Sequence, residues 1–156
     1  MPNEPTENSV EAWHRYFAVE CNNRGWDLSV KERDSGQDEE MLHAAHASAF
    51  HWAAIGTELN RMRATMLLAE VHALLGNGET ALAYASTMRD FFLDQDDTPD
   101  WEIAFTYAIH AHAADVAGEI KVHKDAYREA QSALAAIEDP ADREIVQKTL
   151  DHVRAP

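Results

Sequence analysis

The sequence predicts an all-α protein of about seven helices arranged as antiparallel hairpins, and three observations carry this prediction. Glycine and proline number only six and five in 156 residues, whereas residues that favour helix, such as alanine, leucine and glutamate, are abundant. Apolar residues recur at helical spacing, and no segment alternates as a strand would. Tight turns at Leu74–Leu82 and, more weakly, at Val116–Glu119 each join two amphipathic segments, as in a helical hairpin.

The length suits one domain. We expect residues 1–8 to form a disordered tail and residues 9–153 to fold together. The chain has 28 acidic and 13 basic residues, for a net charge of −15, and this field repels phosphate and anionic lipid. We therefore expect neither nucleic acid nor a membrane to be a partner. The first residues lack the features of a secretory signal, and the single cysteine excludes an internal disulfide, so a cytoplasmic location is expected.

The first helix is expected to begin after Ser9, whose hydroxyl can cap it, and to continue to about Val30. An interruption that ends at Gly25 leaves an alternative, in which the helix stops there and starts again. Residues 31–38 are polar and predict a loop.

The next three helices follow from apolar periodicity and glycine turns. A second helix over about 38–55 is apolar around much of its circumference and ends at Gly56. A third helix is predicted over 58–75. Residues 76–78 form the turn, where glycine adopts positive φ at little cost, and a fourth helix covers 79–93.

Cap signals mark the last three helices. Thr98–Pro99 is expected to open the fifth helix, with threonine as N-cap and proline at the first helical position, and this helix ends at Gly118. The sixth helix is predicted over 120–137. Asp139–Pro140 repeats the cap-plus-proline start, and the seventh helix is expected to end near Val153.

The segment Thr65–Met88 resembles a tetratricopeptide repeat. In that family a small residue lies five positions after the turn glycine, and another small or apolar residue lies seven positions later. In this chain these positions are Gly76, Ala81 and Met88. The family also packs a leucine, a small residue and an aromatic ring in the preceding helix. The corresponding residues here are Leu68, Ala69 and His72.

A second copy of the pattern is degenerate. Gly118 repeats the turn, but His123 stands where the family has a small residue, and the two turn glycines lie further apart than the family's usual period of about 34 residues. The resemblance implies a short, tetratricopeptide-like superhelix of stacked hairpins. It also implies a non-catalytic protein- or peptide-binding role, without a cofactor.

Polar and aromatic residues that interrupt otherwise apolar helices predict a ligand groove along the first helices of the hairpins. Asn22 and Trp26 lie four residues apart and therefore share a face of their helix. The residues expected to face a ligand are Asn23, Trp26, His43, Asn60 and His72. In the alternative interpretation, the asparagines bond helix ends and His72 fills the aromatic position of the repeat.

The nine histidines suggest an alternative function. Glu40 and His43 have the Glu-x-x-His spacing of carboxylate-bridged metal sites, and His46 lies on the same helix face as His43. A metal-dependent enzyme or metal sensor would use Glu40, His43 and His46 with a ligand from another helix, such as His72 or His110. In the alternative interpretation, these rings are packing elements.

No sequence motif indicates a nucleophile–base pair or a phosphate-binding loop, so a binding protein is favoured over an enzyme. A second copy of the chain is a third candidate partner. The apolar second helix and Phe91–Phe92 would supply the face of such a homodimer.

Overall fold

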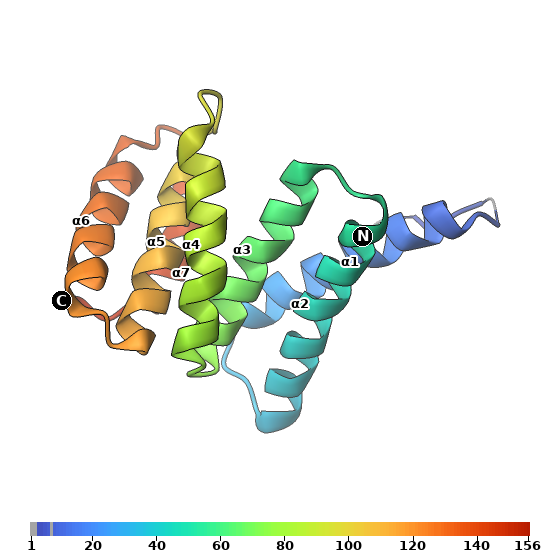
Figure 1. Ribbon diagram of the computed structural model, residues 1–156, viewed down its shortest axis with the longest axis horizontal. Helices are drawn as coiled ribbons and strands as arrows, with labels where there is room; N and C mark the ends of the chain where they lie inside the picture. Colours follow the sequence, from blue (N-terminus) through green and yellow to red (C-terminus); the bar gives the residue numbers. More distant parts are fainter. Residues whose placement is uncertain (1–2, 7) are drawn as a thin grey trace.

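The computed structural model contains seven α-helices and, over residues 3–6 and 8–156 that it describes, no strand. The predicted all-helical fold class is therefore confirmed. The helices are α1 (Val10–Ser29), α2 (Ser35–Ile55), α3 (Glu58–Leu74), α4 (Gly78–Asp94), α5 (Asp100–Ala117), α6 (Ile120–Ala136) and α7 (Pro140–Leu150) (Figure 1). Residues 1, 2 and 7 of the expected tail lie outside the described residues, and residues 3–6 have no helix or strand.

The helices are arranged in two layers. Each helix contacts the next one along the chain, and α1 also contacts α3, α3 contacts α5, and α5 contacts α7. Over the described residues, α2, α4 and α6 make no such contacts with one another. The odd-numbered helices therefore form one continuous layer, and the even-numbered helices lie against it (Figure 1).

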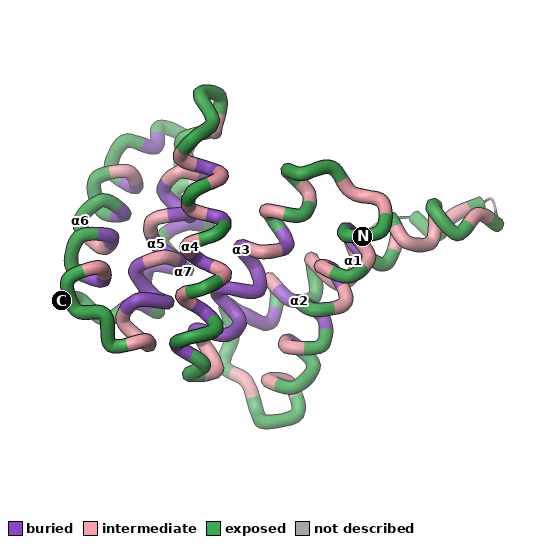
Figure 2. The backbone as a smooth tube through the Cα atoms, in the orientation of Figure 1, coloured by how far each residue is buried: buried purple, intermediate pink, exposed green. Residues whose placement is uncertain are grey.

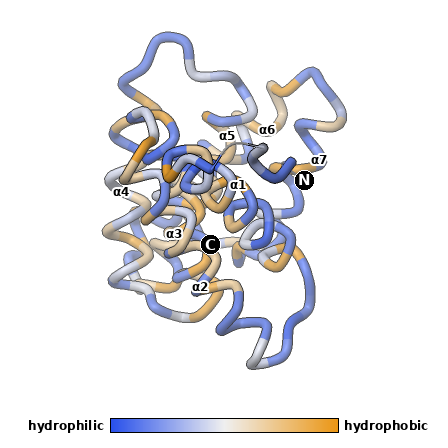
Figure 3. The backbone as a smooth tube through the Cα atoms, turned by 90° about the vertical axis from the view of Figure 1, so that its right-hand side faces the viewer, coloured by the Kyte–Doolittle hydropathy of each residue, from blue (hydrophilic) through white to orange (hydrophobic). Residues whose placement is uncertain are grey.

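The core is continuous through α3 and α5. The larger cluster of buried residues takes side chains from every helix from α3 through α7. A smaller cluster connects α1, α2 and α3 through Leu28, Met41, Leu67, Leu68 and Val71. Figure 2 shows buried positions concentrated on α3 and α5, and Figure 3 shows hydrophilic segments at the outer loops. Because α3 contributes to both clusters, it couples the amino-terminal hairpin to the rest of the molecule. No helix in the described part of the chain is long and apolar enough to cross a membrane.

The first helix is continuous, as predicted, and Gly25 explains the interruption in its pattern. This glycine is buried where α1 meets α3, and a Cβ atom added to it would lie 2.8 Å from Cδ2 of Leu67. The absence of a side chain allows the two helices to approach closely. Gly25 is therefore a packing position and not a helix end.

The second helix begins earlier than predicted, at Ser35 instead of about Asp38. Asp34 accepts a hydrogen bond from the backbone N–H of Gln37 at 2.8 Å, and the Gln37 side chain accepts one from the backbone N–H of Asp34 at 3.0 Å. This reciprocal capping box stabilises an additional helical turn. The predicted loop over 31–38 is correspondingly shorter.

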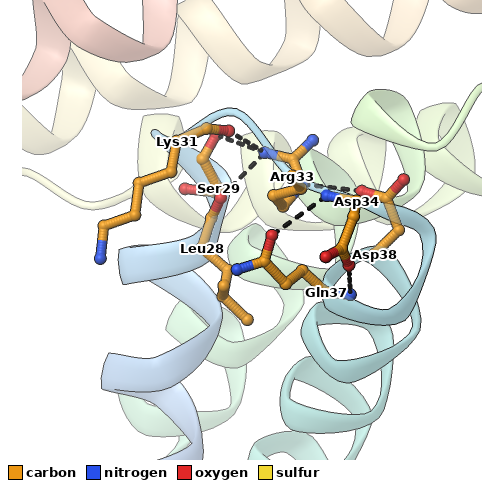
Figure 4. Close-up of polar contacts among 7 residues, drawn as sticks. All are labelled: Leu28, Ser29, Lys31, Arg33, Asp34, Gln37 and Asp38. Atoms are coloured by element: carbon orange, nitrogen blue, oxygen red, sulfur yellow. Dashed lines mark hydrogen bonds and ion pairs between the residues drawn. The ribbon is translucent and has the colours of Figure 1, made fainter.

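Arg33 holds this loop against the end of α1 (Figure 4). Its Nε atom donates to Asp38 at 2.8 Å. Its Nη1 atom donates to the main-chain carbonyls of Leu28, Ser29 and Lys31. The guanidinium thus satisfies carbonyls that the helix end leaves without partners, and its positive charge complements the negative end of the helix dipole.

The start of the fifth helix was predicted incorrectly in one detail. Pro99 is the N-cap residue and α5 begins at Asp100, so Thr98 does not cap the helix. The Thr98 hydroxyl instead donates to the main-chain carbonyl of Phe92 at 2.7 Å and closes the loop after α4. The caps of the other predicted starts agree with the structure, because Ser9 caps α1 and Asp139 caps α7.

The remaining helix ends follow the glycine turns. Gly76 and Gly118 have φ angles of +79° and +77°, the left-handed conformation that glycine adopts most readily. The seventh helix ends at Leu150, three residues before the predicted end near Val153, and Val153 packs in the core beyond it.

Candidate ligand-binding cleft

A cleft of about 500 Å³ opens on the layer of odd-numbered helices. Its lining residues come from α1 and the residue after it, α3, α5 and α7. They are Asn22, Trp26, Asp27, Val30, Arg63, Met66, Trp101, Glu102, Phe105, Ile145, Lys148 and Thr149. This volume lies in the range of small-molecule and peptide side-chain pockets, which are typically apolar with a few placed polar groups.

Three aromatic rings build the apolar part of the cleft. Trp26 of α1 meets Phe105 of α5 edge to face, with ring centroids 5.4 Å apart. Trp101 also lies edge to face with Phe105, with centroids 6.3 Å apart. Phe105 is buried, whereas the two indoles remain partly exposed and are available to a ligand.

An ion pair lies beside these rings. Arg63 of α3 donates from Nε and Nη2 to the two carboxylate oxygens of Glu102 of α5, at 2.7 and 2.9 Å. The Glu102 side chain is only 2% exposed and that of Arg63 is 44% exposed. The guanidinium carbon also lies 5.8 Å from the ring centroid of Trp101, within the range of a cation–π contact. The hydrogen bond to Glu102, aided by its charge, raises the pKa of Arg63 against the effect of burial.

Most charges that line the cleft are compensated. Glu102 neutralises Arg63, and Lys148 pairs with Glu144 at 2.9 Å. Asp27 is exposed and forms no ion pair with any residue that the structure describes. The cleft therefore combines a neutral aromatic interior with one unpaired carboxylate on α1.

Of the residues predicted to face a ligand, Trp26 lines the cleft. Asn22 lines it one turn earlier on α1, in agreement with the predicted shared face. Asn23 is exposed and is not among the lining residues. Asn60 bonds reciprocally with Thr57 in the capping box of α3, which is the helix-end role given by the alternative interpretation.

The predicted histidines lie away from the cleft lining. His72 is buried and stacks on Tyr84, with ring centroids 5.7 Å apart. Its Nε2 atom lies 3.1 Å from Nε2 of His46, and its Nδ1 atom lies 3.3 Å from Nδ2 of Asn77. His43 is exposed. His72 therefore forms part of a hydrogen-bonded network between α2 and the turn after α3.

The alternative metal ligands Glu40, His43 and His46 are not gathered into one site. Both carboxylate oxygens of Glu40 accept hydrogen bonds from Arg24, at 2.6 and 2.9 Å. Over residues 3–6 and 8–156, no group of three or more His, Cys, Asp or Glu side chains is placed to hold a metal ion. His72 of α3 does approach His46, but Glu40 is bonded to Arg24 and these two rings alone do not make a group of three ligands.

The residues considered for a homodimer face differ in exposure. Phe92 is 1% exposed and Phe91 packs against the same core, so this pair serves the interior of the fold. Phe50 of α2 is 68% exposed, beside His14 and His51.

Sequence reasoning missed Arg63, Trp101, Glu102 and the α7 side of the cleft. A signal was present in Glu102, a carboxylate in the first turn of an otherwise apolar helix. A buried carboxylate requires a cationic partner, but spacing alone could not identify Arg63, which lies on another helix.

Comparison with protein-family models, with curated proteins and with solved structures finds no match to this chain. The function is therefore inferred from the geometry of the cleft.

Proposed function

We propose that the protein is a non-catalytic, tetratricopeptide-like interaction module that binds a protein or peptide partner in the cleft between α1, α3, α5 and α7. The observation that carries the proposal is the pair of partly exposed indoles, Trp26 and Trp101, set around Phe105 beside the Arg63–Glu102 pair. Tryptophan and arginine are enriched at the centres of binding interfaces, where they supply most of the binding energy.

The lining residues favour binding over catalysis. The acidic and basic residues that line the cleft are Asp27, Arg63, Glu102 and Lys148, and the last three are held in ion pairs. Two ion pairs neutralise charge at the cleft. Glu102 pairs with Arg63, and Lys148 pairs with Glu144. The cleft therefore offers a ligand apolar contact area and polar groups that can orient it.

The layered architecture also supports the proposal. The odd-numbered helices contact one another in sequence and line one cleft, as the first helices of stacked hairpins line the groove of a helical repeat protein. The predicted cytoplasmic location and the strongly acidic surface are compatible with a partner that is itself a protein.

The test is selection of peptides from a random display library, followed by affinity measurement against two matched variants. Asn22→Trp places a large ring in the cleft, and Asn23→Trp places the same ring on the exposed neighbouring position, outside the cleft lining. We expect selected peptides to bind the Asn22→Trp protein at least ten times more weakly than the wild type and the Asn23→Trp protein unchanged. Failure to select any peptide, or equal loss in both variants, would overturn the proposal.

A further inference from the structure

We infer that the cleft recognises a peptide segment in which a large apolar side chain is adjacent to a basic residue. The apolar side chain enters between the indoles, Arg63 donates to a main-chain carbonyl of the segment, and Asp27 pairs with the basic side chain. This inference rests on the proposed peptide-binding function and specifies its ligand.

The apolar requirement follows from the walls of the cleft. Trp26, Trp101 and Phe105 form its aromatic part, and Met66 lies beside them. Val30, just after α1, is 41% exposed, and Ile145 of α7 is 53% exposed. Both add apolar surface to the cleft. A volume of about 500 Å³ accommodates a large side chain such as leucine, phenylalanine or tryptophan with its main chain. Burial of such a side chain removes apolar surface from water and therefore favours binding.

Arg63 is suited to a neutral acceptor. Glu102 accepts hydrogen bonds from Nε and Nη2 of Arg63, and these two bonds fix the direction of the guanidinium. The Nη1 atom makes no hydrogen bond with any described residue. Glu102 also cancels the charge of Arg63, and the pair cannot separate cheaply because a buried carboxylate would lose its partner. The two N–H groups of Nη1 are therefore donors of fixed direction within a pair that has no net charge. Such donors match the carbonyl of a peptide bond better than they match a second carboxylate.

Asp27 supplies the preference for a basic residue. It is exposed at the cleft and has no ion-pair partner among the described residues, whereas Lys148 is already paired with Glu144. The whole chain carries a net charge of −15, so its field attracts cations and repels acidic segments as they approach. A lysine or arginine next to the apolar anchor satisfies both the local carboxylate and the overall field.

The experiment uses three dipeptide probes and records indole N–H signals of the full chain by nuclear magnetic resonance. The probes are acetyl-Leu-Arg-amide, acetyl-Leu-Glu-amide and acetyl-Gly-Arg-amide. We expect the Leu-Arg probe to shift the Trp26 and Trp101 signals with saturation. The Leu-Glu probe is expected to bind at least ten times more weakly, and the Gly-Arg probe to give no saturable shift.

Two variants separate the roles of the polar groups. Arg63→Lys keeps a cation beside Glu102 but removes the Nη1 donors, and we expect it to weaken the Leu-Arg probe about tenfold. Asp27→Asn changes only an exposed side chain and should reduce the preference of Leu-Arg over Leu-Glu to the part that the overall charge supplies, while leaving the fold intact. Equal binding of both Leu probes to the wild type, or no effect of either variant, would overturn the inference.

The outcomes also distinguish this inference from the proposed function. If library peptides bind in a manner sensitive to Asn22→Trp but show no enrichment of basic and apolar residues, the ligand class is wrong and peptide binding stands. If no peptide binds in the cleft, the proposed function fails, and the ligand class fails with it.

Discussion

The Nδ1 atom of His112 on α5 lies 3.0 Å from the Oε2 atom of Glu70 on α3, in the interior of the protein. The two side chains are 7% and 0% exposed. Burial lowers the pKa of His112, but the charge of Glu70 and the hydrogen bond to it outweigh this effect, and the pKa is raised. The other oxygen of Glu70 has no hydrogen-bond partner among the described residues, so His112 is its main compensation.

Removal of His112 alone should therefore destabilise the protein strongly. We expect His112→Leu to lower the free energy of unfolding by about 3–5 kcal/mol at pH 6, because it leaves a buried carboxylate without a cation. The double variant Glu70→Met/His112→Leu should lose much less, since it removes both charges and keeps apolar volume. Urea denaturation of the wild type, both single variants and the double variant gives the coupling energy, and strictly additive losses would contradict the role of the pair.

The same pair gives a signed pH dependence. Because the folded-state pKa of His112 is raised above its unfolded value of about 6.5, the stabilisation is present below pH 6.5 and is lost as the pH rises through the folded-state pKa. As the pH rises through this window, we expect the free energy of unfolding of the wild type to decrease relative to that of the double variant. Urea midpoints measured from pH 5.5 to 8.5 test it, and a difference independent of pH would contradict it.

His110 should produce the opposite dependence. Burial lowers its pKa to about 4, with a smaller contribution from Arg89, and its Nδ1 atom has no hydrogen-bond partner within the described structure. Its stabilising neutral form is fully present above the unfolded pKa of about 6.5, and stability is lost as the pH falls toward 4, by at most about 3 kcal/mol.

The variant His110→Gln should remove part of this acid sensitivity. We expect its stability to fall less than that of the wild type between pH 6.5 and 4.5, as measured by thermal unfolding followed by circular dichroism. His43→Gln, at an exposed histidine, is the matched control and should keep the wild-type slope. Equal slopes for the wild type and His110→Gln would show that His110 does not titrate with a lowered pKa in the folded protein.

Local signals predicted most of the fold. Ser9 and Asp139 cap helices as their sequence context indicated, and the glycine turns have the expected positive φ angles. The errors occur at two helix starts. At α2 a local signal was missed, the capping box of Asp34 and Gln37, whereas at α5 Thr98 bonds to a carbonyl of the previous helix instead of capping its own.

The cleft was less predictable because it depends on contacts between helices. The prediction that Asn22 and Trp26 share a face needed only their spacing within one helix, and both residues line the cleft. The pairing of Arg63 with Glu102 joins residues 39 apart, and it depends on the register of α3 against α5. His43 and Asn60 were selected for being polar within helices, but one is exposed and the other is used in a cap.

The capping box of α2 provides a local test of stability. Asp34 accepts the backbone N–H of Gln37 and lies in a loop that Arg33 also stabilises. We expect Asp34→Ala to lower the free energy of unfolding by about 1 kcal/mol, within the range of about 0.5–2 kcal/mol for lost N-caps. Asp97→Ala, in the exposed loop after α4, is the control and should change stability by less than about 0.5 kcal/mol. Urea denaturation compares them, and similar losses in both would indicate a general charge effect.

A pair of glycine substitutions tests the close packing of α4 against the end of α5. A Cβ atom at Gly78 would lie 2.6 Å from the backbone of Ala117 and from the Val116 carbonyl oxygen, and backbone atoms cannot move aside as a side chain can. We therefore expect Gly78→Ala to cost about 1–3 kcal/mol. Gly36→Ala, in the first turn of α2, meets nothing closer than 3.4 Å and should gain up to about 1 kcal/mol from reduced chain entropy. Thermal unfolding of the two variants should shift in opposite directions, and a Gly78→Ala protein as stable as the wild type would show that α4 and α5 can separate at this point without loss.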